Sequence, residues 1–193
     1  MDELKDLILD KAKDRFDRFG FKKTTMDEIS RDCKISKKTI YEQFKDKEDL
    51  FICLFIRESR KAREIIFARM GEIIDPLDKL IQLVKTATSY FNEDNFLTRL
   101  LKSNDDLFSP FLIMKYRCIA EEEVISIIAD IISEGKKQGK LRDVDEKVTA
   151  YAGLKLFQAF SYMQTMEFCK EKEAQGYYTD VLVDFLVNAI IKK

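Results

Sequence analysis

Two adjacent lysines, Lys37 and Lys38, stand where a short helix is predicted to begin, directly after the helix-capping candidate Ser36. Cations in a first helical turn are unfavourable by about 0.3 to 1 kcal/mol each, because the helix dipole is positive at that end. A bound phosphate reverses the sign, since two lysines and free backbone N–H groups then face one anion. Residues 21 to 47 hold eight Lys and Arg against five Asp and Glu, a net charge of +3 in a chain of net charge −1. This pattern favours binding of a polyanion.

Side chains that perform catalysis are scarce in this sequence. The chain has no histidine, which excludes a histidine general base, a Ser–His or Cys–His nucleophile pair and a histidine metal ligand. No paired carboxylates, Gly-rich phosphate loop or metal-ligand cluster is recognisable in the sequence. We therefore expect a protein that is not an enzyme and that needs neither a metal nor another cofactor.

The cysteines and the hydropathy pattern indicate a cytoplasmic protein. The four cysteines, at 33, 53, 118 and 169, form no Cys-x-x-Cys pair and fall in stretches predicted to be helical, which suits reduced thiols. No apolar run approaches the roughly 18 residues that a membrane span needs. The acidic start, Met1-Asp2-Glu3, is unlike a signal peptide. We expect no membrane among the partners.

The scarcity of turn residues predicts an all-α fold. Six Gly and two Pro are few for 193 residues, and no strand pattern or internal repeat is present. Helix-starting residues at 25, 36, 46, 76, 110 and 145, with glycines at 20, 71, 135 and 176, divide the chain into about nine helices. These include a short helix near 96–107 and one from 146 to about 170. Helical spacing places Phe19 on the apolar face of the first helix, and Ile65 is one of the apolar positions along the fourth helix.

Residues 25 to 50 have the organisation of a helix-turn-helix. Thr25 and Glu28 match a capping box, and the two residues between Cys33 and Ser36 require a sharp turn before the next helix. If Ile40 and Phe44 face the core, the outward residues of this second helix can contact groove edges and phosphates of DNA: Lys37, Lys38, Thr39, Tyr41 and Gln43. The alternative at this point is a solvated basic patch.

The same stretch resembles the DNA-binding domain of the tetracycline-repressor (TetR) family. The resemblance is carried by Phe19-Gly20-Phe21, Thr24-Thr25-Met26, Ile29, Ile35-Ser36-Lys37-Lys38-Thr39-Ile40-Tyr41 and Phe44-Lys45-Asp46-Lys47-Glu48-Asp49-Leu50. It implies a helix-turn-helix DNA-binding domain over residues 1–47 and a helical ligand-binding and dimerisation domain over residues 48–193. It also implies a homodimeric bacterial transcription regulator, usually a repressor, that a small molecule releases from a palindromic operator.

The resemblance also assigns roles to single residues. Thr25, Tyr41, Gln43 and Lys47 fall on positions that the family commonly uses for phosphates, and Lys37, Lys38 and Thr39 fall on its groove-facing positions. Two residues depart from the family pattern. Lys34 replaces a usual Gly in the turn, where a left-handed residue with a side chain costs roughly 1 kcal/mol or more. Lys38 occupies a position that is often small, which is expected to alter base preference.

The last two predicted helices carry apolar faces that exceed what one neighbouring helix can cover. By resemblance, they form a four-helix bundle with a second subunit, through Ala152, Leu156, Ala159, Met163, Val181, Phe185, Leu186 and Ala189. The alternative is that these faces close the monomer's own core.

A cavity for a small, largely apolar effector needs apolar walls with a few polar groups. We expect its lining to be Phe111, Met114, Cys118 and Glu121 on one helix, with Phe157, Ser161 and Gln164 opposite. The alternative is that these residues are plain core. Glu121 also belongs to the run Glu121-Glu122-Glu123, which as a charge run indicates a solvated face.

A second function class stays open on the sequence alone. An all-helical carrier of lipophilic molecules could use the same basic patch to meet an acidic surface instead of DNA. A salt titration separates the two, because phosphate neutralisation predicts affinity for a duplex that falls steeply with salt concentration.

Overall fold

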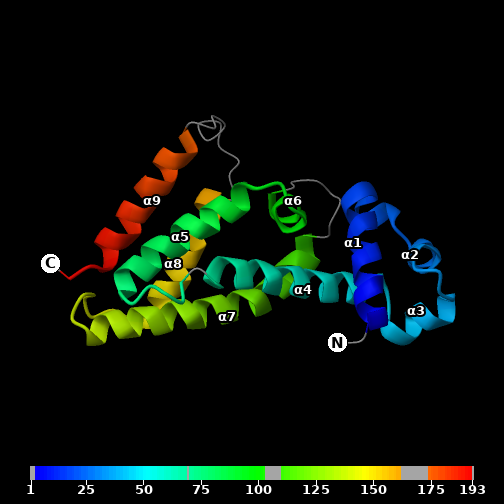
Figure 1. Ribbon diagram of the computed structural model, residues 1–193, viewed down its shortest axis with the longest axis horizontal. Coiled ribbons are helices and arrows are strands. Elements are labelled where there is room, and N and C mark those ends of the chain that lie inside the picture. The colour runs from blue at the N-terminus through cyan, green and yellow to red at the C-terminus, as the bar shows by residue number, and fades with distance from the viewer. Residues whose placement is uncertain (1–2, 69, 103–109, 162–173, 193) are drawn as a thin grey trace. The chain divides into compact units, whose positions relative to one another are not determined.

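The computed structural model describes residues 3–68, 70–102, 110–161 and 174–192, and within these ranges it contains nine α-helices and no named strand (Figure 1). The helices are α1 (Glu3–Lys23), α2 (Met26–Asp32), α3 (Lys37–Gln43), α4 (Lys47–Ala68), α5 (Pro76–Asn92), α6 (Phe96–Lys102), α7 (Pro110–Lys137), α8 (Glu146–Ser161) and α9 (Ala174–Ile190). The predicted all-α fold is confirmed.

The chain divides into two compact units. The first holds residues up to Arg60 with the beginning of α7, and the second holds the remaining helices. None of the helices in the described ranges combines the length and the hydrophobicity needed to cross a membrane. The same ranges contain no group of three or more His, Cys, Asp or Glu side chains placed to hold a metal ion.

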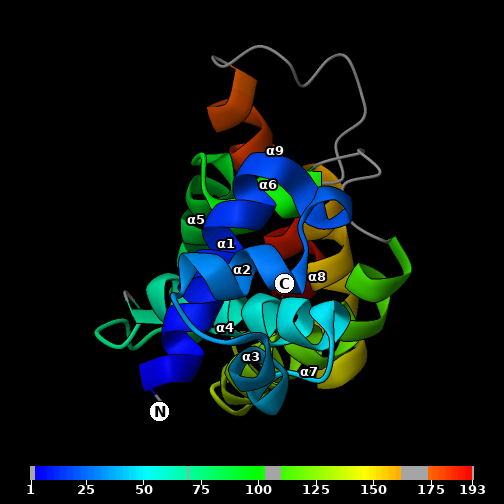
Figure 2. The same cartoon turned by 90° about the vertical axis from the view of Figure 1, so that its right-hand side faces the viewer.

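The first unit is built around a continuous aromatic and aliphatic core. Figures 1 and 2 show α2 lying beside α1, and α3 beside α2. The ring centroids of Phe16, Phe21 and Phe51 lie 5.2 to 5.6 Å apart, in tilted and edge-to-face arrangements. The other buried residues of this core are Ile8, Leu9, Ala12, Ile29, Ile40, Phe44, Leu50 and Leu54.

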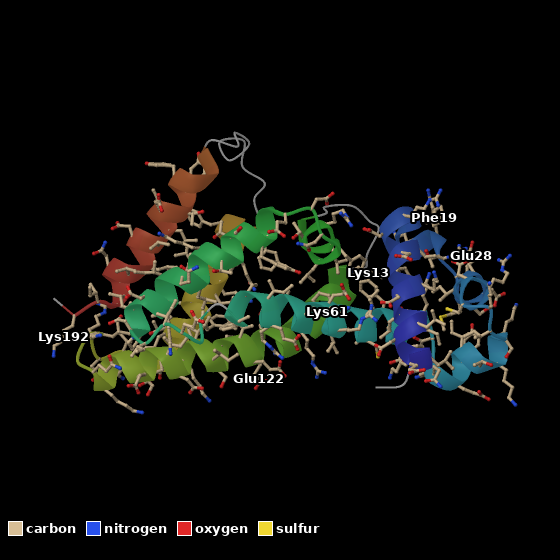
Figure 3. The ribbon with its side chains drawn as sticks, in the orientation of Figure 1. Lys13, Phe19, Glu28, Lys61, Glu122 and Lys192 are labelled. Carbon is tan, nitrogen blue, oxygen red and sulfur yellow. The ribbon has the colours of Figure 1, made fainter. Side chains whose placement is uncertain are left out.

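Gly20 interrupts the first helix. Its backbone lies at φ 77° and ψ 165°, outside the helical region, although the segments before and after it are both counted in α1. The expectation that Phe19 faces inward is wrong: it is 42% exposed and stands at the outer end of α1 (Figure 3). The break at Gly20 instead turns Phe21 into the core against Phe16. The Phe19 ring lies beneath the guanidinium groups of Arg15 and Arg18, at 5.7 and 5.1 Å.

Ion pairs attach the first half of α4 to α1. Lys13 Nζ donates to Glu58 Oε2 at 2.6 Å, and Glu58 is buried. Arg57 donates to Asp10 at 2.7 Å and lies 3.6 Å from the Asp6 carboxylate. Because removing one partner would leave a buried charge uncompensated, these pairs fix the position of α4 on α1 more than they add stability.

The second unit packs α5, α7, α8 and α9 around their own apolar core. Ala129, Ile132, Leu141 and Ala150 form its buried cluster, against which Leu77, Leu80, Ile125, Ile128, Val144 and Ile190 pack. Asp145 caps α8 as the sequence predicts, by accepting the backbone N–H of Val148 at 2.8 Å, and Asp75 caps α5 by accepting those of Leu77 and Asp78 at 2.8 and 3.1 Å. The chain after α9 returns to the turn after α7, where Arg142 N donates to Ile190 O and Lys192 N to Lys140 O.

Three predicted details of these helices need correction or fall outside the described ranges. Ile65 is exposed, and its neighbour Ile66 takes the buried position on α4. Gly176 lies inside the first turn of α9 and does not precede it. The short helix near 96–107 is described as α6 up to Lys102, and the helix predicted to reach about 170 is described as α8 up to Ser161.

Candidate nucleic-acid interface

The start of α2 is fixed by the predicted capping box. Thr25 Oγ1 accepts the backbone N–H of Glu28 at 3.3 Å, and Glu28 Oε2 accepts that of Thr25 at 2.9 Å. The Thr25 hydroxyl also donates to Glu28 Oε2 at 2.8 Å, and these hydrogen bonds hold the pKa of Glu28 below its ordinary value. Arg15 stands 3.2 Å from the other Glu28 oxygen. Thr25 is therefore held at the surface by groups on both α1 and α2.

The turn between α2 and α3 has the hydrogen bonds of a Schellman motif. Ile35 N donates to Ser30 O and Lys34 N donates to Arg31 O, both at 3.0 Å. Lys34 has a φ of 55°, the left-handed value that this motif requires and that glycine adopts at no steric cost. The turn is thus tight enough to bring α3 beside α2, and a lysine occupies its strained position.

Capping and burial orient α3 as the sequence predicts. Ser36 Oγ accepts the backbone N–H of Thr39 at 3.0 Å, so the helix begins at Lys37. Ile40 and Phe44 are buried on the inner side. Tyr41 is exposed and Gln43 is half-buried.

The two lysines of the first turn are paired but accessible. Lys37 Nζ contacts the Asp27 carboxylate, and Lys38 Nζ lies 3.8 Å from Glu42 Oε1. Their side chains are nevertheless 68% and 87% exposed. A phosphate oxygen can reach either ammonium group without any rearrangement of the core. The two ion pairs reduce the predicted unfavourable interaction of the lysines with the helix dipole, but both ammonium groups remain accessible from solvent.

Thr39 and Lys47 are more constrained than the sequence indicates. The Thr39 hydroxyl is 2.8 Å from Ser36 Oγ. Lys47 Nζ donates to the backbone carbonyls of Phe21 at 2.8 Å and Thr24 at 2.9 Å, and lies 4.3 Å from the Phe21 ring centroid. Burial lowers the pKa of Lys47. Two of its three N–H donors are used by the end of α1, which leaves one for a phosphate.

Two charged residues of this surface were missed by sequence reasoning. Arg15 donates to both Asp32 oxygens, at 2.5 and 3.0 Å, which lowers the pKa of Asp32 and joins α1 to α2. Asp27 is the partner of Lys37. Both pairings cross between helices, so they depend on the turn geometry and leave no signal at a fixed sequence spacing.

Glu121, a predicted cavity-lining residue that also belongs to a charge run, is buried. Its carboxylate accepts from Lys155 Nζ and from Gln158 Nε2, both at 2.6 Å, so α7 and α8 are joined through a buried polar cluster. Glu122 and Glu123, the other two residues of the charge run, are exposed to solvent. Burial of Glu121 follows from its partners on α8, which cannot be read from the charge run itself.

The other predicted effector contacts are described to different extents. Phe157 is buried, with its ring 6.1 Å from that of Phe91. Phe111, Met114, Cys118 and Ser161 lie on described helices, but the structure does not describe their side chains. Gln164 lies outside the described residues, as does Met163 of the predicted dimer face.

The predicted dimer face leaves large apolar side chains on the surface of the single chain. Phe185 is 62% exposed, and Val181 is exposed as well. Ala152 and Ala159 are exposed, and Leu156, Leu186 and Ala189 are half-buried. Sequence reasoning missed four further exposed residues on the same two helices: Val148, Tyr151, Phe160 and Tyr177. Such a concentration of apolar surface is typical of a protein interface.

A family model confirms what the geometry of α1 to α4 indicates. Residues 8–53 match the model of bacterial regulatory proteins of the tetR family. Residues 8–53 therefore form a DNA-binding domain of the tetR-family type. The tetR-family match covers the capping box, the turn and all of α3, the elements that the sequence resemblance picked out.

The similar proteins are also regulators. The chain is 28% identical over 158 residues to an uncharacterized HTH-type transcriptional regulator, YhgD, of Bacillus subtilis, with 82% of each chain covered. Among solved structures, the fatty acid degradation regulator FadR from Bacillus halodurans superposes with a TM-score of 0.74 at 19% identity, covering 97% of this chain and 96% of that one. AibR, solved in complex with isovaleryl coenzyme A and operator DNA, gives 0.64 at 18% identity, covering 96% and 98%. These structures show that the chain shares their fold.

Proposed function

We propose that this protein is a transcriptional regulator that binds an operator as a homodimer through α3, and that it is a repressor that a small, largely apolar effector releases. In this proposal, residues 1–47 form the DNA-binding domain and residues 48–193 the ligand-binding and dimerisation domain, and the protein acts in the bacterial cytoplasm, where its operator lies. The observation that carries it is the first turn of α3, where two accessible lysines stand on a helix whose inner side is buried.

The proposed contacts divide by chemistry. Lys37, Lys38 and Thr39 face the groove, where lysine prefers the O6 and N7 acceptors of guanine. Thr25, Tyr41, Gln43 and Lys47 contact phosphates and fix the register, which carries no sequence information by itself. The accessibility of Tyr41 and the remaining N–H donor of Lys47 support these assignments.

The apolar face of α8 and α9 supports a homodimer. Phe185 and the exposed side chains around it would be covered by the same face of a second copy, since a two-fold interface uses one surface twice. A dimer presents two copies of α3, which fits an operator of two half-sites separated by one helical turn, about 34–36 Å, or a multiple of it.

The regulatory part of the proposal follows from this spacing. A ligand that prefers a dimer with differently separated α3 helices prevents both from docking at once. A differential ligand affinity of roughly 3 kcal/mol would weaken operator binding about 150-fold. AibR is a structural neighbour solved with both a ligand and operator DNA, which makes ligand-responsive control a reasonable proposal for this chain as well.

The test is selection of genomic fragments with the purified full-length protein, followed by footprinting of the recovered duplexes. We expect a protected palindrome with two half-sites, with affinity that falls steeply as salt increases. Failure to enrich any duplex, together with binding of lipophilic molecules, would favour the carrier alternative.

A further inference from the structure

The two ion pairs of α3 differ in what they join. Lys38 and Glu42 lie on the same helix at 3.8 Å, both largely exposed, with the cation N-terminal to the anion, which is the less favourable order. Lys37 instead contacts Asp27, ten residues earlier, so this pair joins the first turn of α3 to the first turn of α2. The Asp27 pair is therefore part of the helix-turn-helix geometry.

Asp27 stands where it opposes an approaching polyanion. It is the second residue of α2, two positions after the capping residue Thr25 that is proposed to contact a phosphate. The neighbouring carboxylate, Glu28, is compensated by Arg15 on α1 and by the Thr25 hydroxyl. The Asp27 carboxylate is instead compensated by Lys37, a residue that the proposed function assigns to DNA. A phosphate that replaces Asp27 as the partner of Lys37 leaves this carboxylate uncompensated beside the duplex.

We infer that Asp27 is a specificity-determining residue, which withholds Lys37 from phosphates and so weakens binding to duplexes without an operator. This inference rests on the proposed function. Non-specific binding comes essentially from phosphate neutralisation, so a lysine that is already neutralised adds little to it. An operator can compensate for breaking the pair, because Lys37 can then form hydrogen bonds to guanine acceptors in the groove, in addition to its charge interaction with phosphates. Asp27 thus widens the affinity ratio between operator and random duplex.

The size of the effect follows from the exposure of the pair. An exposed ion pair contributes at most about a fivefold effect, which sets the expected gain per subunit when Asp27 loses its charge. If Lys37 then neutralises one more phosphate, the slope of log affinity against log salt becomes steeper by about 0.9 per subunit.

The experiment compares full-length wild type with D27N, which keeps the side-chain size and removes the charge. Binding to a labelled random-sequence duplex and to a duplex selected by the wild type is measured over a series of salt concentrations. E42Q is the matched control, since it removes a carboxylate that pairs with the other lysine of the same turn. We expect D27N to tighten binding to the random duplex by up to about fivefold per subunit, with the steeper slope, and to lower the affinity ratio. E42Q should change these values much less.

A double variant tests whether the gain passes through Lys37. K37Q in the D27N background should remove the affinity and the steeper slope that D27N gains over wild type, because the gain requires the Lys37 ammonium group. A merely structural role of Asp27 would not produce this dependence, and circular dichroism checks that helical content is retained. D27N that equals wild type on the random duplex, or E42Q that reproduces its gain, overturns the inference alone. Wild type that binds no duplex in a salt-dependent way overturns the proposed function as well.

Discussion

Replacing Lys34 by glycine should stabilise the protein, because a lysine occupies the left-handed position of the α2–α3 turn. Within the described residues, Lys34 is the one non-glycine residue with positive φ, at 55°. Its N–H and that of Ile35 make the two bonds of the Schellman motif, so the turn cannot relax without losing them. The side chain is exposed, so its removal leaves no cavity.

The magnitude is a difference of two effects. The left-handed conformation costs a residue with a side chain roughly 1–2 kcal/mol, and K34G removes this cost. Glycine also increases the conformational entropy of the unfolded chain, which lowers the free energy of unfolding by about 0.4–1 kcal/mol. The net expectation is a gain of about 0.5–1 kcal/mol in the free energy of unfolding, which is within reach of denaturant titrations.

The assay is urea unfolding followed by circular dichroism, with Lys34→Ala as the matched control. Alanine removes the same charge and the same methylenes but keeps the Cβ that makes the left-handed region unfavourable. We expect K34G to be more stable than wild type and K34A to show no such gain. K34G that is no more stable than K34A would refute the assignment of strain to this turn.

Three further predictions concern other parts of the molecule. Phe185→Glu should convert the proposed dimer into monomers in sedimentation experiments, because it places a charge in the proposed interface. The control is Ile74→Glu, which should not change the oligomeric state, because Ile74 is an even more exposed apolar residue that lies outside α8 and α9. Glu121→Leu should lower the free energy of unfolding by about 1–3 kcal/mol in denaturant titrations, because its buried hydrogen-bond partners lose their acceptor. Arg15→Gln should destabilise the protein at pH 7 but progressively less below about pH 4. The hydrogen bond to Arg15 lowers the pKa of Asp32 in the folded protein from its ordinary value of 3.8. The stabilisation by this ion pair is therefore fully present above pH 3.8 and is lost as the pH falls through the lowered pKa. A pH-independent difference would contradict this assignment.

The sequence predicts this fold well where the determining interactions are local. Thr25, Ser36 and Asp145 start helices because each side chain accepts the backbone N–H of the residue three positions later, and the sequence contains both partners. The sharp turn after α2 is likewise local, since only two residues separate Cys33 from Ser36, whereas the left-handed conformation of Lys34 is implied by the resemblance to the TetR family.

The errors and omissions arise where distant residues decide the environment. Phe19 was placed inward by helical spacing, but the break at Gly20 changes which aromatic residue reaches the core. The charge run that contains Glu121 is typical of a solvated face, but Lys155 and Gln158 of α8 provide partners that make burial of Glu121 possible. The position of Asp27 beside Lys37 depends on the crossing of two helices. Spacing within one helix contains no information about such pairs.

The most direct test of the account is operator binding by the double variant K37A K38A. The two side chains point outward from α3 and contribute nothing to its buried side, so helical content and dimerisation should remain as in wild type. We expect operator affinity to fall to that of a random duplex, because both the groove contacts and two positive charges per subunit are lost. A folded double variant that still binds the operator as wild type does would contradict the assignment of α3 as the DNA-reading helix.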